Sequence, residues 1–185
     1  ELTRSDLIQA NKTAAEFFPT VLKYAEHGES ARLVVGRRGI SPAMVEAFGL
    51  GASPHRWDGL LLTLQSKSLP IEPFVSAGLL KSRDTGGYYD AFRNRLMFPI
   101  HDQIGRVIAF GARKIDEADE PKYLNSPETR LFEKSATLYG LFQAAKSIQT
   151  ERTAIITEGY TDTIACHQAG ITNVVATLGT ALTRR

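Results

Sequence analysis

The last part of the sequence contains the pattern that most restricts the fold. A short β-branched run at 153–157 is followed at once by Glu158 and Gly159, then by a helical stretch at 161–169 and a second β-branched run at 173–177. Strand, helix and strand within so few residues are typical of two parallel strands joined by a right-handed crossover. We therefore predict a compact βαβ unit.

The preceding residues predict a different organisation. Apolar residues at three- to four-residue spacing favour short helices over most of the first 80 residues. Pro19 falls inside the first of these helices and predicts a break or kink there. The runs at 95–101 and 106–112 favour two strands with turn residues between them, and so predict a β-hairpin. Pro99 in the first strand indicates a sheet edge or a bulge.

Together these patterns predict an α+β chain in two parts. Residues 1–150 form a mixed helical and β N-terminal subdomain, and residues 151–185 form an incomplete α/β subdomain built on the parallel βαβ unit. With no further strand beside it, the run at 173–177 is expected to be an unpaired sheet edge that promotes aggregation.

Composition excludes several classes of protein. Of 185 residues, 43% are hydrophobic and 23% charged, which excludes a disordered tail, a collagen-like fibre and a coiled coil. No apolar run approaches the roughly 18–20 residues that span a bilayer, so we expect no membrane partner. The single cysteine, Cys166, excludes a disulfide framework and a cysteine-based zinc site, and it fits a reducing cytoplasmic compartment.

Glu158 is the strongest single candidate for chemistry. It follows a predicted parallel strand directly, and ligands of open α/β sheets collect beyond the carboxyl ends of such strands. Gly159 beside it has no side chain and allows close approach of the backbone to a ligand. A carboxylate in this place suits Mg²⁺ binding or acid–base chemistry, although Mg²⁺ usually needs a second anionic ligand.

The net charge is only +2, but arginines are concentrated around the predicted hairpin. Arg93 and Arg95 stand two residues apart, so an extended strand would point both side chains to one face. Arg106 and Arg113 come from the partner strand. Several arginines on one face of a sheet would form a surface for a phosphate backbone, and these four are candidate template-binding residues.

Aromatic and polar residues nearby extend this candidate surface. Tyr88 and Tyr89 are able to stack on bases, whereas Phe92 fits core packing better. The loop at 122–127 concentrates hydrogen-bonding groups, and with Lys134 it provides lysines for phosphate groups.

Several segments share their order and spacing with one known family. They are residues 38–41, 48–52, 92–100, 105–113, 121–129, 132–134, 138–141 and 158–181. In these segments the chain resembles the catalytic core of the bacterial replicative DNA primases of the DnaG type, that is, the N-terminal basic subdomain and the start of the TOPRIM domain. The resemblance covers essentially the whole chain, and its most specific parts are 95–100 and 122–127.

The resemblance implies a function and a set of roles. Such primases are nucleotidyltransferases with DNA-directed RNA polymerase activity, which copy single-stranded DNA into short RNA primers at the bacterial replication fork. The family's catalytic and metal-binding glutamate matches Glu158, which implies Mg²⁺ or Mn²⁺ as cofactor. The residues matching the template groove are Arg38, Arg93, Arg95 and Arg113. The residues matching the nucleotide and primer site are Lys122, Asn125 and Lys134. The implied partners are single-stranded template DNA, nucleoside triphosphates, the RNA primer and the replicative helicase.

The chain also departs from the family pattern. The family's TOPRIM domain continues to an Asp-x-Asp metal pair, and this sequence contains no Asp-x-Asp. It contains no Cys-x-x-Cys either, so zinc is expected only in an N-terminal module of the parent protein. The helicase is expected to bind a C-terminal domain that is also missing. Because nucleotidyl transfer uses two divalent ions held between carboxylates, we expect the chain alone to be inactive in primer synthesis.

Three other functions remain open from the sequence. A TOPRIM nuclease or topoisomerase would share Glu158 and the βαβ unit, but the motifs at 93–100 and 122–127 do not belong there. A phage-type primase–helicase would differ only in further C-terminal sequence. A non-catalytic single-stranded DNA-binding module would need the arginines but not Glu158.

Overall fold

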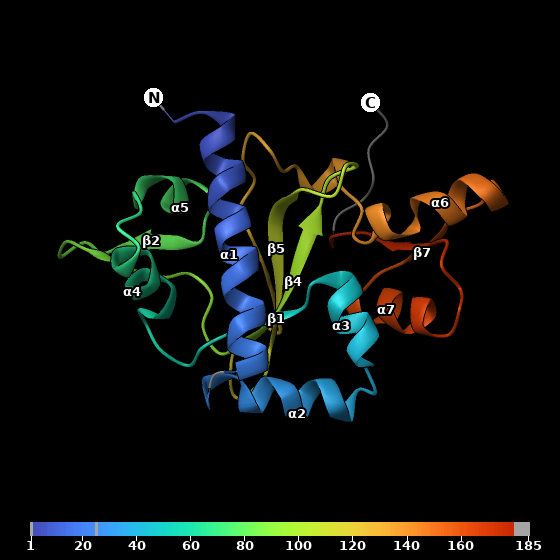
Figure 1. Cartoon of the computed structure of the whole chain (residues 1–185), viewed down its shortest axis with the longest axis horizontal. Coiled ribbons are helices and arrows are strands. Elements are labelled where there is room, and N and C mark those ends of the chain that lie inside the picture. The colour runs from blue at the N-terminus through green and yellow to red at the C-terminus, as the bar shows by residue number, and fades with distance from the viewer. Residues whose placement is uncertain (1, 25, 180–185) are drawn as a thin grey trace.

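A four-stranded antiparallel sheet forms the centre of the chain (Figure 1). The computed structural model describes residues 2–24 and 26–179. In order across the sheet, the strands are β1 (Gly51–Ser53), β4 (Arg95–His101), β5 (Val107–Lys114) and β6 (Tyr123–Asn125). The long helix α1 (Arg4–Tyr24) runs across the sheet and contacts β1 and β5.

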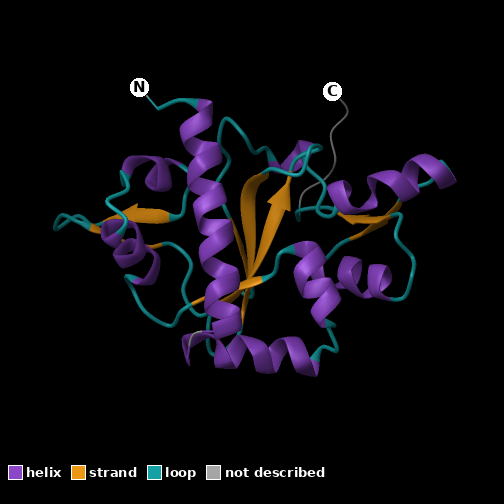
Figure 2. Ribbon diagram, viewed as in Figure 1, coloured by secondary structure: helices purple, strands orange, loops and turns teal. Residues whose placement is uncertain are grey.

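Smaller elements flank the sheet on both sides (Figure 2). At one side lie α4 (Gly59–Ser66), α5 (Glu72–Ser76) and the hairpin of β2 (Leu80–Ser82) and β3 (Tyr88–Asp90). At the other side lie α6 (Leu141–Glu151), β7 (Ile155–Thr157), α7 (Tyr160–Gln168) and β8 (Val174–Ala176). The remaining elements are α2 (Glu29–Arg37), α3 (Pro42–Phe48) and the 3-10 turns Glu26–Gly28 and Lys134–Ala136. None of the helices in the described ranges combines the length and apolar character needed to cross a membrane.

The predicted βαβ unit is confirmed. Strands β7 and β8 pair in parallel, with Ile155 opposite Val174, and α7 connects them. The expectation that 173–177 would be an unpaired edge is wrong. On the side away from β7, Ala176 forms an antiparallel bridge with Tyr139. Helices α6 and α7 pack against β8, whose three side chains are buried. The exposed strand is β7, where Ile156 is 52% exposed.

Strand β4 is buried on both faces and separates two hydrophobic cores. Because side chains alternate along a strand, Leu96, Phe98 and Ile100 face one core together with Tyr160 and Ile164 of α7. Met97 faces the other core, which also contains Phe18 of α1, Leu60 of α4 and Phe110 of β5. The apolar run of β4 therefore joins the N-terminal part of the chain to the βαβ unit.

The predicted hairpin is also confirmed, with strands β4 and β5 in antiparallel register. Pro99 does not lie in an edge strand, because β4 runs between β1 and β5. However, β1 ends opposite Met97, so β4 has no partner on that side at Pro99, and the register shifts just beyond it between Ile100 and His101. The predicted break at Pro19 is wrong, since α1 continues through it to Tyr24.

Candidate functional site

Three cationic side chains are brought together at one end of the β4–β5 hairpin. Arg95 lies opposite Lys114, and Arg113 lies opposite Leu96. All three are largely buried, and burial lowers the pKa of the Arg95 guanidinium. Arg95 Nη1 donates to the Lys122 carbonyl oxygen over 3.4 Å, which links the hairpin to β6. This end of the sheet is therefore strongly positive.

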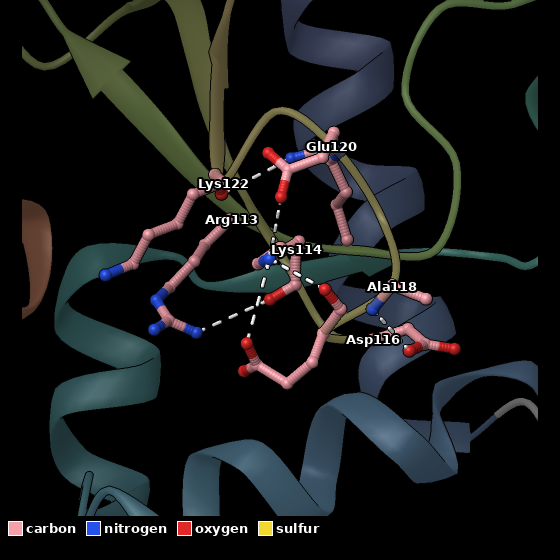
Figure 3. A network of polar contacts seen from close by, with 8 residues as sticks. Arg113, Lys114, Asp116, Ala118, Glu120 and Lys122 are labelled. Atoms are coloured by element: carbon pink, nitrogen blue, oxygen red, sulfur yellow. Dashed lines mark hydrogen bonds and ion pairs between the residues drawn. The ribbon is translucent and has the colours of Figure 1, made fainter.

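An acidic loop, residues 116–120, covers part of this positive end (Figure 3). The Lys114 ammonium donates to the Glu117 carbonyl oxygen over 2.9 Å and lies 3.3 Å from Glu120 Oε1 and 3.7 Å from Glu117 Oε2. Asn94 Nδ2 donates to Asp119 over 3.2 Å. The loop thus neutralises Lys114, and the charges of Asp119 and Glu120 also act on Arg95.

Arg113 and Lys122 extend together away from the acidic loop, as Figure 3 shows. Arg113 Nη1 donates to the Lys114 carbonyl oxygen over 3.4 Å, and its Nε is buried without a hydrogen-bond partner among the described residues. A buried guanidinium with an unused donor is costly unless a ligand or water completes it. Arg113 therefore carries a donor that the described part of the chain leaves unsatisfied.

Arg93 and Arg95 do not share a face of one strand, contrary to the sequence expectation. Asn94 between them adopts φ +50°, so β4 begins only at Arg95 and the two-residue alternation is broken. Arg93 instead stacks on Trp57, with its Cζ 3.8 Å from the ring centre, and its Nη1 donates to the Asp90 carbonyl oxygen over 2.6 Å. Arg93 thus faces a different part of the surface from Arg95.

Trp57 is the centre of an exposed aromatic and cationic cluster. Its side chain is 54% exposed, and its ring lies 5.5 Å from that of Tyr89. Arg83 lies over both rings, at 5.1 Å from Tyr89 and 5.7 Å from Trp57. Tyr88 and Tyr89 are half-buried, whereas Phe92 is buried in the core, as its pattern predicted. Trp57 was not predicted as a binding residue. The signal that could have identified it is that the one tryptophan of the sequence lies close to arginines.

Arg106 is not part of this group. The register of the hairpin places it at the opposite end, in the turn between β4 and β5. There its Nε forms a 2.7 Å ion pair with Asp102, which also accepts a hydrogen bond from the Arg106 backbone. The expectation that Arg93, Arg95, Arg106 and Arg113 would share one face of the sheet is therefore wrong. The register also places Arg113, opposite Leu96, on the other face from Arg95, which lies opposite Lys114.

The loop at 122–127 is joined to the βαβ unit by Tyr160. The Tyr160 hydroxyl donates to Asn125 Oδ1 over 2.6 Å, and burial raises the pKa of this hydroxyl, so it stays protonated as a donor. Its ring stacks on Phe98 at 4.9 Å. A Cβ built on Gly111 would collide with the Tyr160 ring, so the absence of a side chain at 111 permits the contact. No pattern in the sequence indicated this role, because Tyr160 and Asn125 are 35 residues apart.

Glu158 directly follows β7 and is exposed. A Cβ built on Gly159 would lie 3.0 Å from Asp162 Oδ2, so a second carboxylate borders the residue next to Glu158. Carboxylate oxygens suit Mg²⁺ or Mn²⁺. However, the part of the chain that the structure describes contains no group of three or more acidic, histidine or cysteine side chains able to hold a metal. Glu158 and Asp162 therefore fit such an ion as part of a larger ligand set.

Arg38 follows α2 and is brought to α7 by Gln168. Gln168 Oε1 accepts a hydrogen bond from the Ser41 backbone over 2.8 Å, and its Nε2 donates to the Gly39 carbonyl oxygen over 2.7 Å. Arg38 and Asp162 line the same hollow of about 420 Å³. Lys134 is separate from this arrangement: it begins a 3-10 turn, where its backbone donates to Glu128 over 3.0 Å.

Comparison with protein families assigns both parts of the chain. The family "DNA primase catalytic core, N-terminal domain" matches residues 17–145, and the family "Toprim domain" matches residues 152–185. The chain therefore belongs to the family of DNA primase catalytic cores.

The relatives and solved structures are primases of the DnaG type. The chain is 44% identical to the DNA primase of Halalkalibacterium halodurans over 96% of its length, and 46% identical to that of Synechocystis sp. over 98%. It spans about a third of these curated relatives, 30% and 29% respectively.

The fold of the chain is also similar to the folds of solved primase structures. The RNA polymerase domain of Mycobacterium tuberculosis DnaG, in complex with double-stranded DNA bearing a 6-nucleotide overhang, gives a TM-score of 0.91 at 38% identity, covering 98% of this chain and 57% of that one. A DnaG primase catalytic domain bound to single-stranded DNA gives 0.85 at 38% identity, covering 97% and 57%.

Proposed function

We propose that the chain provides the template-binding and nucleotide-binding surface of a DNA primase, an enzyme that copies single-stranded DNA into short RNA primers. The observation that carries this proposal is the 2.6 Å hydrogen bond from Tyr160 to Asn125. It connects the segment that bears Glu158 to the loop that bears Lys122. The residues expected to meet metal and nucleotide are therefore held together by one contact. Membership of the primase family favours this function over a TOPRIM nuclease or topoisomerase.

The template strand would be bound by two different kinds of contact. Arg93, Arg95 and Arg113 supply charge for phosphates, in line with the DNA complexes of the similar primases. Trp57, with Arg93 against its ring, supplies an exposed π-surface on which an unpaired base stacks. Arg38 extends the cationic surface toward α7. This combination suits single strands, whose bases are free to stack.

The incoming nucleotide and the primer end would lie at the loop after β6. Asn125 uses its Oδ1 to accept from Tyr160, and its Nδ2 has no hydrogen-bond partner within the described ranges. That amide is thus directed by Tyr160 and free to donate to a nucleotide. Lys122 and Lys134 would offset the charge of the triphosphate. In the reaction, the primer 3′-hydroxyl forms a bond to the α-phosphorus of the nucleoside triphosphate and pyrophosphate leaves.

Glu158 would act as metal ligand and acid–base group, with Asp162 beside it. A bound Mg²⁺ or Mn²⁺ would neutralise charge that develops on the reacting phosphates. The family's Asp-x-Asp pair does not occur in this sequence, so we propose that the chain alone does not synthesise primers. In the whole protein, the helicase would bind a C-terminal domain, zinc would belong to an N-terminal module, and the enzyme would act in the bacterial cytoplasm at the replication fork.

Fluorescence anisotropy of a labelled single-stranded oligonucleotide, titrated with the chain at two salt concentrations, tests the proposal. We expect salt-sensitive binding that is weakened by Arg93→Ala and by Lys122→Ala. Lys146→Ala is the matched control, because Lys146 is an exposed lysine on α6. Arg106→Ala should behave like this control. Equal binding by all four variants and the parent chain, each shown to be folded by circular dichroism, would refute the proposed surface.

A further inference from the structure

A buried carboxylate lies directly beneath the Trp57–Arg93 pair. Asp90, the last residue of β3, is only 2% exposed. Its Oδ2 accepts the backbone N–H of Leu60 over 2.7 Å, and its Oδ1 accepts the N–H of Leu61 over 3.1 Å. Both donors belong to the first turn of α4, which starts two residues after Trp57. The carboxylate therefore caps α4 from a distant part of the chain.

The backbone of Asp90 contacts both members of the pair. Its N–H donates to the Trp57 carbonyl oxygen over 2.8 Å, and its carbonyl oxygen accepts from Arg93 Nη1 over 2.6 Å. The Arg93 guanidinium that is held in this way stacks on the Trp57 ring at 3.8 Å. One buried residue thus fixes the segment before α4 and the side chain that lies on its aromatic ring.

The local alternative for capping α4 is present but not used. Asp58 occupies the N-cap position, where an aspartate commonly accepts a helix N–H, yet its side chain makes no such bond. It forms a 2.7 Å ion pair with Arg56 instead. Since a helix can be capped locally at little cost, a buried carboxylate supplied from β3 indicates a role beyond helix stability.

We propose that Asp90 is a positioning residue of the template-binding surface, which holds Trp57 and Arg93 in the stacked arrangement that receives an unpaired base of single-stranded DNA. This inference rests on the proposed function of that surface. Asp90 itself is buried and does not touch the DNA. Its loss would therefore act only through Trp57 and Arg93.

The sequence provides a direct probe, since Trp57 is its one tryptophan. Quenching of Trp57 emission by an oligothymidylate measures binding at this place. We expect Asp90→Asn, which keeps the shape but removes the charge, to weaken binding by roughly fivefold or more, the lower end of what one stacked base contributes. Combined with Arg93→Ala, which removes the stacked guanidinium, the same change should weaken binding less than twofold further, because effects through a shared partner are not additive.

Asn173→Ala is the matched control, because it shows whether a loss of stability by itself changes the affinity for DNA. Asn173 is also a buried polar residue, and its side chain donates to Thr153 in the βαβ part of the chain. We expect its replacement to lower stability without changing affinity. If Asp90→Asn behaves like Asn173→Ala, or if its effect adds fully to that of Arg93→Ala, Asp90 has no positioning role. Trp57→Ala lacks the tryptophan, so its affinity is measured by fluorescence anisotropy of a labelled oligothymidylate. If Arg93→Ala and Trp57→Ala leave affinity unchanged, the proposed template surface itself is wrong.

A pH titration of the unchanged chain keeps the test valid if Asp90→Asn does not fold. Burial raises the pKa of the Asp90 carboxyl to about 6. Protonation turns one accepting oxygen into a donor, so Leu60 or Leu61 loses its acceptor. We expect Trp57 emission and affinity to change together between about pH 7.5 and about pH 5. Emission that is independent of pH in this range would overturn the proposal.

Other groups around Asp90 must be separated from it. The charged or titratable residues of the packed segments are His55, Arg56 and Asp58 before α4, Lys81 of β2, Arg83 after it, Tyr89 of β3, and Arg93. The first turn of α4 contributes none. His55 is the one histidine among them, so the pH titration is repeated in His55→Gln. The transition should persist there, and its disappearance would refute the role of Asp90.

Discussion

The Tyr160 hydroxyl donates a 2.6 Å hydrogen bond to Asn125 Oδ1, and this bond joins the βαβ unit to the loop after β6. The contact is buried against Phe98 of β4. Because Tyr160 stands two residues after Glu158, the position of the proposed metal ligand and that of the nucleotide loop depend on the same side chain. This contact leads to predictions about the stability of the chain when Tyr160 or its neighbours are changed.

Tyr160→Phe should lower the free energy of unfolding by about 1 kcal/mol, since it removes one hydrogen bond and leaves Asn125 Oδ1 without its donor. Tyr139→Phe is the matched control. The Tyr139 ring contacts that of Tyr160 at 4.6 Å, but its buried hydroxyl has no partner in the described part of the chain. Its removal should be neutral or stabilising. Urea denaturation measures both, and equal losses in the two variants would contradict the assignment.

Gly111→Ala should destabilise the chain by about 1–3 kcal/mol or more, because the new methyl group would collide with the Tyr160 ring in a filled core. Gly36→Ala is the control. Gly36 lies inside α2 with open space around its Cβ position, so alanine should stabilise the helix by up to about 1 kcal/mol. Thermal unfolding of both variants tests the contrast. A Gly111→Ala chain as stable as the parent would show that Tyr160 packs elsewhere.

Asp90 should make the chain less stable as the pH rises. Its pKa of about 6 in the folded chain exceeds the ordinary value of 3.8, so between these values the folded state holds a proton that the unfolded state has lost. The stabilising contribution is complete below about pH 4 and disappears as the pH passes 6, a difference of roughly 3 kcal/mol. Subtracting the pH profile of Asp90→Asn isolates it from other carboxylates. If the difference in unfolding free energy between the parent chain and Asp90→Asn increased with pH, the prediction would be wrong.

The acidic loop should weaken DNA binding in the parent chain. Glu117 and Glu120 neutralise Lys114, so changing both to glutamine frees a cation beside Arg95 and removes repulsion of phosphates. We expect the affinity for single-stranded DNA to be about two- to fivefold higher. The slope of log affinity against log salt concentration should steepen by up to about the amount that one phosphate contact contributes. Glu151→Gln, at the exposed end of α6, should not change affinity. An unchanged salt slope in the double variant would contradict the prediction.

The sequence predicted the elements that depend on local pattern and missed those that depend on contacts between distant segments. Two runs with turn residues between them identified β4 and β5, and the strand–helix–strand pattern identified β7, α7 and β8. Pairing across long separations could not be predicted: the bridge to Ala176 of β8 comes from Tyr139, which lies outside any strand. Pro19 lies in α1 because tertiary packing on the sheet outweighs the lost hydrogen bond.

The candidate site shows the same division. Its position after a predicted strand identified Glu158 as a candidate. The predicted hairpin identified Arg113, and the polar loop at 122–127 identified Lys122. The separation of Arg93 from Arg95 arises from one positive φ at Asn94, and an asparagine in the left-handed region cannot be distinguished by pattern from one in a strand. Asp90 was not a candidate from the sequence, because its role depends on α4, which lies 29 and 30 residues away at the bonded positions.

The alternation of β4 between two cores restricts how the gene for such a chain can change in length. Inserting or deleting one codon within 95–101 would exchange the residues that face each core, and both cores would lose their packing at once. The turn between β2 and β3, where Gly86 and Gly87 adopt positive φ with open space around them, carries no such restriction. Length variation among related chains should therefore accumulate in that turn, while β4 keeps its length.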